Sequence, residues 1–467
     1  MNKSINDIVV DYSLGYNLDK DILLKYQFFP LQEYDIYYLV AVVDNMIDID
    51  QIEKLFSKPV KVVYISKKVF EFEIKNLEYK YHIFELSKKA VVSSDENDLD
   101  ISLISMFAKK LFEFAISLNT SDIHIETLEN SLIIRFRIDG MLIQLFRFEY
   151  NLYYILSASL KLFAALDISQ KRLPQNGRFS KNILNKSYDF RISILPINNG
   201  ESIVIRILDN TKAFIKLEDI GFETKVYNQI NKYINTNQGL ILITGPTGSG
   251  KTTTLYSILN KLNNQNKKII SLEDPVEYNI EGIQQVSINS DIGLDYDIVL
   301  KNILRQDPDI IMIGEIRDAK TLSVAIQAAL TGHLIIATLH TNSAAKTLNR
   351  LFDLKAEPFL IASVLKLIVS QRLIRLLCNN CKKSKKIGNQ ILYEATGCSQ
   401  CNLSGYKNRT IITESLQIDE TIAQMIHQKQ SIRDIVQYAD CSSINENSYN
   451  KVLNGETSLE EYYRHEI

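Results

Sequence analysis

The segment Gly239–Thr253, which reads GLILITGPTGSGKTT, constrains the fold of this chain more than any other. It joins an apolar strand to a glycine-rich loop and then to a helix, and it matches the pattern G-x-x-x-x-G-K-[ST]. Glycine permits the backbone conformations that turn successive N–H groups inward, and the start of the helix adds the positive end of its dipole. The sequence therefore predicts a parallel α/β sheet that binds phosphate at this loop.

This loop is the candidate nucleotide site. Lys251 is expected to reach the β- and γ-phosphates, and the Thr252 hydroxyl is expected to ligate Mg²⁺. The alternative is a chance glycine turn before a helix, and the strand–loop–helix context argues against it. The predicted nucleotide-binding residues are Gly245, Pro246, Thr247, Gly248, Ser249, Gly250, Lys251, Thr252 and Thr253.

Polar residues follow three apolar strands downstream of the loop. Glu315 comes after Ile310–Ile313, Glu273 follows Lys268–Leu272, and His340 follows Leu334–Leu339. Ligands of open α/β sheets bind at the carboxyl edge of the strands. A carboxylate there can orient the attacking water, so Glu315 is the predicted catalytic residue, Glu273 a second carboxylate and His340 a sensor of the γ-phosphate. Each residue alone would more often be structural, and it is the phosphate loop that favours the catalytic interpretation.

Length and composition limit the remaining choices. A chain of 467 residues allows about three domains. With 53 Lys+Arg against 55 Asp+Glu, it lacks the basic excess of a general nucleic-acid binder, and no direct nucleic-acid partner is expected. The polar segment Met1–Asp11 does not resemble a secretory signal, and no apolar run is long enough to span a bilayer.

The pattern of strands and helices predicts three parts. Residues 1–94 read as a small α/β docking module, residues 95–212 as an α+β middle domain, and residues 213–467 as the α/β motor domain. The polar stretch Ser93–Asp100 is predicted to be a linker, and Leu152–Ile168 a buried amphipathic helix. The predicted middle-domain strands are Asp122–Glu126, Leu132–Ile138, Met141–Phe148, Arg178–Ser180, Ser187–Leu195 and Glu201–Leu208, with a hairpin turn at Asp139-Gly140.

Four of the five cysteines form two C-x-x-C pairs, Cys378/Cys381 and Cys398/Cys401. Two such pairs at this separation are typical of tetrahedral zinc, because each tight turn supplies two thiolates. An iron–sulfur cluster, a redox pair and idle thiols are the alternatives. A zinc ion held by four cysteines has no open position, so the predicted metal, in a subdomain spanning residues 376–410, is structural.

These motifs together resemble the GspE/PilB family of secretion ATPases, which serve type II secretion and type IV pilus assembly. The resemblance implies a RecA-like P-loop motor domain after a PAS-like middle domain. Pilus-retraction ATPases generally lack the cysteine element, so its presence favours assembly over retraction. The segments that carry the resemblance are Gly245–Thr253, Leu272–Tyr278, Leu304–Asp318, Thr331–Asn342, Ser121–Glu126, Arg135–Gly140, Lys171–Phe179, Arg191–Leu208 and Gly397–Arg409.

The family also implies roles that spacing does not reveal. Arginines of the middle domain are expected to reach nucleotide phosphates, and the candidates are Arg178, Arg191 and Arg206, followed by Arg135 and Arg137. Guanidinium groups stabilise charge on a transferring phosphoryl group, although the same arginines could instead pair with carboxylates on a strand face.

The resemblance implies a hexameric, cytoplasmic ATPase at the inner membrane, acting on a membrane platform protein with ATP and Mg²⁺. Two rivals remain: a traffic ATPase that translocates DNA or protein, and a nucleotide-dependent scaffold that does not hydrolyse. The cysteine and middle-domain motifs argue against the first, and intact Glu315, Lys251 and Thr252 argue against the second.

Overall fold

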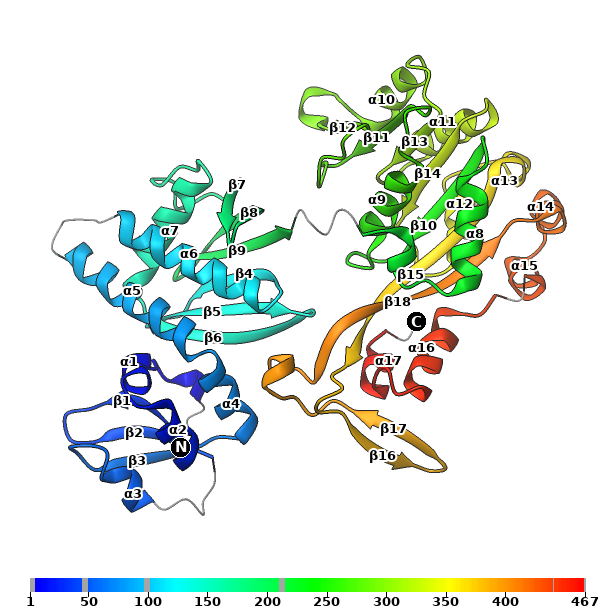
Figure 1. The fold of residues 1–467 in the computed structure, drawn as a ribbon. Coiled ribbons are helices and arrows are strands. Elements are labelled where there is room, and N and C mark those ends of the chain that lie inside the picture. Colours follow the sequence, from blue (N-terminus) through cyan, green and yellow to red (C-terminus); the bar gives the residue numbers. More distant parts are fainter. Residues whose placement is uncertain (1–4, 44–48, 96–100, 210–214, 440, 466–467) are drawn as a thin grey trace. The chain divides into compact units, whose positions relative to one another are not determined.

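The computed structural model describes residues 5–43, 49–95, 101–209, 215–439 and 441–465. The chain divides into two compact units, whose helices and strands are labelled in Figure 1. Unit 1 is Met1–Asn210 with Cys378–Lys383 and Ala395–Lys407, and unit 2 is Thr211–Leu377 with Ser384–Glu394 and Asn408–Ile467. The predicted boundary at 212 lies outside the described residues. Among those residues, no helix is long and apolar enough to cross a membrane.

Unit 1 begins with a small α/β module. Its sheet has the order β1-β2-β3, with β1 antiparallel and β3 parallel to β2. The elements are α1 (Tyr12–Tyr16), α2 (Lys20–Tyr26), β1 (Phe28–Glu33), β2 (Tyr38–Val42), α3 (Ile49–Glu53), β3 (Val60–Tyr64), α4 (Lys67–Lys75) and α5 (Leu77–Asp95). The predicted linker Ser93–Asp100 begins too early, because α5 continues to Asp95. Within this helix the Ser93 hydroxyl donates to Ala90 O at 3.0 Å. Residues 96–100 of that linker lie outside the described residues.

The rest of unit 1 contains a six-stranded antiparallel sheet of order β6-β5-β4-β9-β8-β7. Its elements are α6 (Ile101–Ser117), β4 (Thr120–Thr127), β5 (Ser131–Ile138), β6 (Met141–Glu149), α7 (Leu152–Phe163), β7 (Gln175–Ile183), β8 (Lys186–Ile197) and β9 (Gly200–Asp209). Asp139 and Gly140 both have positive φ, as a tight hairpin turn requires. Helix α7 ends five residues before the predicted Ile168, because Ala165 adopts positive φ and Leu166 N–H returns to Lys161 O.

Unit 2 is built on a seven-stranded sheet of order β12-β11-β13-β14-β10-β15-β18, in which the pairings from β12 to β15 are parallel. The strands are β10 (Gly239–Thr244), β11 (Ile269–Glu273), β12 (Gln284–Ser287), β13 (Ile310–Ile313), β14 (Leu334–Leu339), β15 (Leu365–Leu377) and β18 (Tyr406–Gln417). The helices are α8 (Thr224–Ile234), α9 (Lys251–Leu262), α10 (Tyr296–Ile303), α11 (Ala319–Leu330), α12 (Ala344–Asp353), α13 (Pro358–Val364), α14 (Glu420–His427), α15 (Ile432–Tyr438), α16 (Ile444–Leu453) and α17 (Leu459–His465).

Burial on both faces explains why the central strands are apolar throughout. Along β10, Leu240 and Leu242 join one core with α10 and α11, whereas Ile241 and Ile243 join the other core with α8 and α9. Alternate residues of a strand point to opposite faces, so a sheet covered on both sides needs apolar residues at every position. The predicted RecA-like arrangement of parallel strands and covering helices is confirmed.

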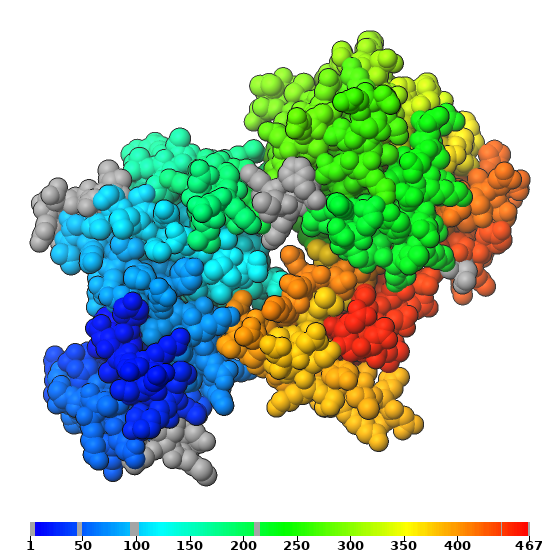
Figure 2. Space-filling model, viewed as in Figure 1, coloured from blue at the N-terminus to red at the C-terminus, as the bar shows by residue number. Residues whose placement is uncertain are grey.

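A hairpin of β16 (Lys383–Ile387) and β17 (Gln390–Glu394) separates the two cysteine pairs. Every side chain of β16 is exposed, and in Figure 2 the hairpin's gold atoms project from the surface. Leu392 of β17 is buried, and β17 contacts α16 and α17. The hairpin is therefore held on one side only.

Candidate functional site

The phosphate loop connects β10 to α9, as predicted. Gly245, Gly248 and Gly250 all have positive φ, and Gly250 caps the N-terminus of α9 in the left-handed conformation. A Cβ at Gly245 would lie 2.4 Å from the carbonyl oxygen of Gln371 and 2.6 Å from Ser249 Oγ. Any larger residue there would collide with β15, so both the backbone angle and the space require glycine.

Lys251 lies in the first turn of α9, and its ammonium group turns back toward the loop. It donates to the carbonyl oxygens of Gly245 at 2.7 Å and Pro246 at 3.0 Å. Burial lowers the Lys251 pKa, and the nearby carboxylate of Glu315 opposes that shift. Thr252 and Thr253 follow on the exposed side of the helix. Lys251 and Thr252 thus line the same cavity.

Glu315 stands at the carboxyl end of β13, as predicted. The backbone before it is fixed, because Gly314 N–H donates to Leu272 O at 2.7 Å and the Thr338 hydroxyl donates to Gly314 O. The carboxylate of Glu315 has two basic neighbours. Arg317 Nε lies 2.9 Å from Oε2, and His340 Nε2 lies 3.4 Å from Oε1.

These residues line one cavity of about 430 Å³ in unit 2. The phosphate loop, Glu273, Asp274, Glu277, Glu315 and His340 all contribute to its wall. His333, which precedes β14, does not: its Nδ1 lies 2.9 Å from Ala328 O at the opposite end of that strand. The carboxyl edge of the sheet therefore brings together an ammonium group, carboxylates and an imidazole, which can bind phosphate and orient an attacking water.

Glu273 is more deeply buried than Glu315 and has different partners. It is only 4% exposed, and one oxygen accepts hydrogen bonds from Ser271 Oγ at 2.6 Å and Gln285 Nε2 at 3.1 Å. The other oxygen accepts from the hydroxyl of Tyr256. Burial and the Glu273 charge both raise the Tyr256 pKa, so the hydroxyl remains a donor. This network occupies both oxygens of Glu273.

Sequence reasoning missed several residues of this cavity. Arg317 bridges Glu315 and Asp274, its Nη1 lying 3.2 Å from Asp274 Oδ2, and the Glu315 hydrogen bond raises the Arg317 pKa. Leu373 of β15 and Arg409 of β18 also line the cavity. The position of Arg317, two residues after Glu315, was a usable signal. Leu373 and Arg409 gave none, because their strands lie far along the chain from the loop.

The predicted arginines form a row across the antiparallel sheet of unit 1. Arg178 pairs with Arg191 across β7 and β8, and Arg191 with Arg206 across β8 and β9. Arg206 lies opposite Asp122 of β4, with its Nε 3.0 Å from Asp122 Oδ1. Arg137 of β5 lies on the other side of Asp122, with its Nε 3.8 Å from Asp122 Oδ2. Together with Asp122, the three arginines Arg178, Arg191 and Arg206 line a cavity of about 510 Å³. Like charges directly opposite each other destabilise a sheet, so this row is suited to an anion.

Arg135 takes a different position from the row. Its Nη2 lies 2.5 Å from Oε1 of Glu126 on β4. In the register of β5 with β4, Arg135 pairs with His124. Burial is the main cause that lowers the His124 pKa. Arg135 is therefore already paired with a carboxylate.

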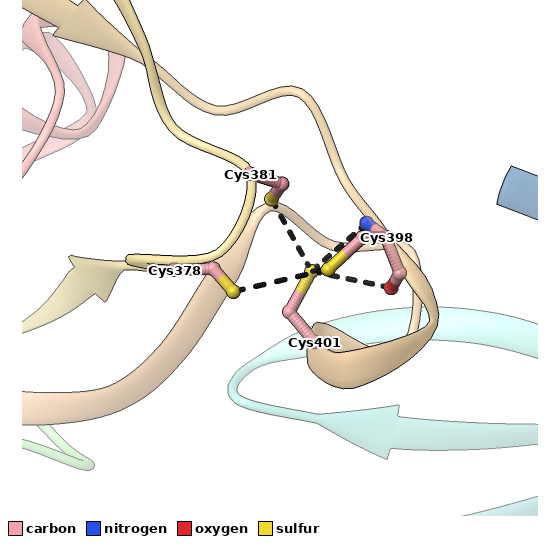
Figure 3. A group of neighbouring side chains, drawn as sticks. All are labelled: Cys378, Cys381, Cys398 and Cys401. Carbon is pink, nitrogen blue, oxygen red and sulfur yellow. Dashed lines mark hydrogen bonds between the residues drawn. The ribbon is translucent and has the colours of Figure 1, made fainter.

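The four clustered cysteines converge in unit 1 (Figure 3). Their sulfur atoms all lie within 4.8 Å of one another, with Cys378–Cys398, Cys381–Cys401 and Cys398–Cys401 separations of 3.9, 3.8 and 3.7 Å. Sulfurs held tetrahedrally at about 2.3 Å from one ion lie about 3.8 Å apart. Burial raises the Cys401 pKa to about 12, so a bound cation is what would make this thiol a thiolate. The cluster fits a structural metal.

The cysteine segment also contacts the N-terminal module. Lys68 and Lys75 lie seven residues apart on α4, and their ammonium groups donate to the carbonyl oxygens of Thr396 and Ser399, both at 2.9 Å. Leu403 packs against the apolar core of unit 1. The cysteine segment is therefore part of the packing of unit 1, although it is connected to β15 and β18 of unit 2.

Comparison with known proteins identifies the family of this chain. Residues 97–464 match the family model described as type II/IV secretion system protein. The chain is 42% identical over 388 residues to the type II secretion system protein E of Dickeya dadantii, covering 79% of this chain and 78% of that relative. The chain belongs to the type II/IV secretion system protein family. It is accordingly a secretion ATPase, an enzyme that hydrolyses ATP.

Other relatives agree with this assignment. The type IV pilus assembly ATPase PilB of Myxococcus xanthus is 42% identical over 367 residues, which is 74% of this chain and 65% of that protein. The solved structure of the pilus retraction motor PilT with bound ADP matches with a TM-score of 0.55 and 26% identity, over 77% of this chain and 96% of that one. The Legionella pneumophila ATPase DotB, with a TM-score of 0.59 and 24% identity over 77% of this chain and 95% of that one, shares the fold. The GspE/PilB resemblance predicted from the sequence is confirmed.

Proposed function

We propose that this ATPase is the motor that powers assembly of a type IV pilus or of the pseudopilus of type II secretion or DNA uptake. The observation that carries the proposal is the combination of a phosphate-loop cavity with a converged four-cysteine cluster in one chain. About 40% identity to type II secretion proteins E over roughly four fifths of the chain supports it.

Within the cavity, we assign roles from contacts. Lys251 and the loop N–H groups bind the phosphates, and the Thr252 hydroxyl ligates the Mg²⁺ that accompanies ATP. Glu315 orients the attacking water, and His340, within 3.4 Å of that carboxylate, senses the γ-phosphate. Glu273 holds α9 through Tyr256 and β12 through Gln285.

We assign anion binding to the arginine row of Arg178, Arg191 and Arg206, in keeping with the roles that the family resemblance implies. Arg191 is central, with an arginine on each side. Arg191→Ala is expected to lower the ATPase kcat by about tenfold or more, because a charge-assisted contact to phosphate is lost. The matched control is Lys186→Ala, which removes an exposed cation from the same strand. If both variants keep wild-type turnover, the row does not serve hydrolysis.

We further propose that the cluster of Cys378, Cys381, Cys398 and Cys401 holds structural Zn²⁺. Residues 1–94, 95–212 and 213–467 would act as docking, arginine-bearing and motor parts, respectively. The active form would be a homo-hexamer in the cytoplasm, held at the inner membrane by the platform protein that it drives. The other candidate function is translocation of DNA or protein. A scaffold that does not hydrolyse does not agree with membership of a family of secretion ATPases.

Deletion of the gene in the source organism tests the assignment. Loss of surface pili, of secreted proteins or of DNA uptake, restored by the wild-type gene but not by a Glu315→Gln copy, is the expected result. If all three processes survive the deletion, or the Glu315→Gln copy restores them, the chain is not an assembly motor.

A further inference from the structure

The side chain of Gln371 lies where β10 opens into the phosphate loop. Thr244, the last residue of β10, pairs with Ser370 of β15, so Gln371 is the next residue along the neighbouring strand. Its side chain is fully buried, as is that of Thr254 in the first turn of α9. Neither residue belongs to the G-x-x-x-x-G-K-[ST] pattern.

The Gln371 amide joins the two ends of the phosphate-binding segment. Its Nε2 donates to the carbonyl oxygen of Ser249 in the loop at 2.9 Å, and its Oε1 accepts from the Thr254 hydroxyl at 3.0 Å. The carbonyl of Ser249 can only accept, so the amide has one possible orientation. Each buried bond is expensive to leave unmade, because no water can replace the lost partner.

Gln371 also limits the space for side chains at two glycines of the loop. Its carbonyl oxygen lies against Gly245, and its Nε2 is 3.3 Å from the place of a Cβ on Gly250. One residue therefore meets the loop at its first glycine, at Ser249 and at its last glycine. Phosphate binding needs the loop N–H groups to be oriented before the ligand arrives, since ordering them afterwards weakens affinity.

We propose that Gln371 is a positioning residue for ATP hydrolysis, which holds the phosphate loop in its anion-binding conformation through Ser249 and Thr254. The proposal rests on the assignment of this loop as the ATP site. Gln371 does not contact the nucleotide in this scheme, and acts only through the loop and the first turn of α9. The competing explanation is that the amide merely fastens β15 to α9.

Isosteric changes at Thr254 separate the two explanations. Thr254→Val removes the hydroxyl while keeping the shape, and Thr254→Ser keeps the hydroxyl. The matched control is Ser257→Ala, which removes another buried hydroxyl from the same helix, one that donates to Ile215 O at 2.6 Å. Gln371→Met, which removes both amide bonds, is the second test.

We expect Thr254→Val to raise the KM for ATP and the Kd for ADP about tenfold with a smaller change in kcat. Thr254→Ser should restore both constants, and Ser257→Ala should lower the melting temperature without changing either. The proposal is overturned if Thr254→Val and Gln371→Met lower the melting temperature as Ser257→Ala does but leave KM and Kd unchanged. ADP binding is measured directly, so a wild type that binds ADP without turnover would contradict the ATPase assignment alone.

Discussion

Replacing Glu315 with glutamine is expected to lower steady-state ATP hydrolysis by about two to three orders of magnitude, with ATP binding retained. Glutamine keeps the size of the side chain but cannot accept a proton from water. Lys251 keeps its hydrogen bonds in this variant, since it donates to loop carbonyls and not to Glu315. The measurement is phosphate release at saturating ATP, together with the Kd of a slowly hydrolysed analogue.

The structure supplies a matched control for this change. Glu420→Gln removes an exposed carboxylate from the first turn of α14, which does not line the cavity. It should leave turnover and binding unchanged. Retention of more than about a tenth of wild-type turnover by Glu315→Gln would assign the catalytic carboxylate elsewhere, and Glu273 would be the next residue to test.

Replacing Cys401 with serine is expected to abolish stoichiometric metal binding and to lower the melting temperature of the purified protein. Cys401 is 3% exposed, and its sulfur accepts N–H hydrogen bonds from Cys398 and Gly405, both at 3.2 Å. Binding of a structural metal contributes directly to folding, so the segment that contacts α4 should open to protease when the metal is lost. Elemental analysis, thermal melting and limited proteolysis measure the three effects.

Cys441 provides the control, because its sulfur lies 2.9 Å from Ser415 O, outside the cluster. Cys441→Ser should keep one zinc per chain and the wild-type melting temperature. Stoichiometric iron in the wild type, or no metal at all, would refute the zinc assignment. Full metal content in Cys401→Ser would show that the cluster is not the binding site.

The elements that sequence reasoning placed most accurately are those whose environment is uniform. The predicted bounds of β13 and β14 agree with the structure, because strands buried on both faces are apolar from end to end. Strand β15 was missed, since its interior carries Gln371, Arg372 and Arg375. Those polar residues are compatible with burial only because specific partners meet them, such as Glu461 of α17 for Arg375.

The candidate site also has parts that could be predicted from the sequence and parts that could not. The phosphate loop, Glu315 and the cysteine pairs could be predicted because each motif places its chemistry within a few residues. The arginine row could be named but not arranged, because Arg178, Arg191 and Arg206 become neighbours only through strand register. The contact of Arg317 with both Glu315 and Asp274 depends on the same kind of long-range placement.

The sequence by itself determined the chemistry of this protein: a phosphate-binding loop, a carboxylate at the end of a later strand and four thiols spaced for a metal. Local spacing suffices there, because backbone turns of a few residues orient those groups. Only the tertiary structure decided which partners complete each group, from the Tyr256–Glu273 contact to the amide of Gln371 beside the loop. Those contacts join residues more than ten positions apart, and their burial makes them selective, because a polar group without water must find its partner in the fold.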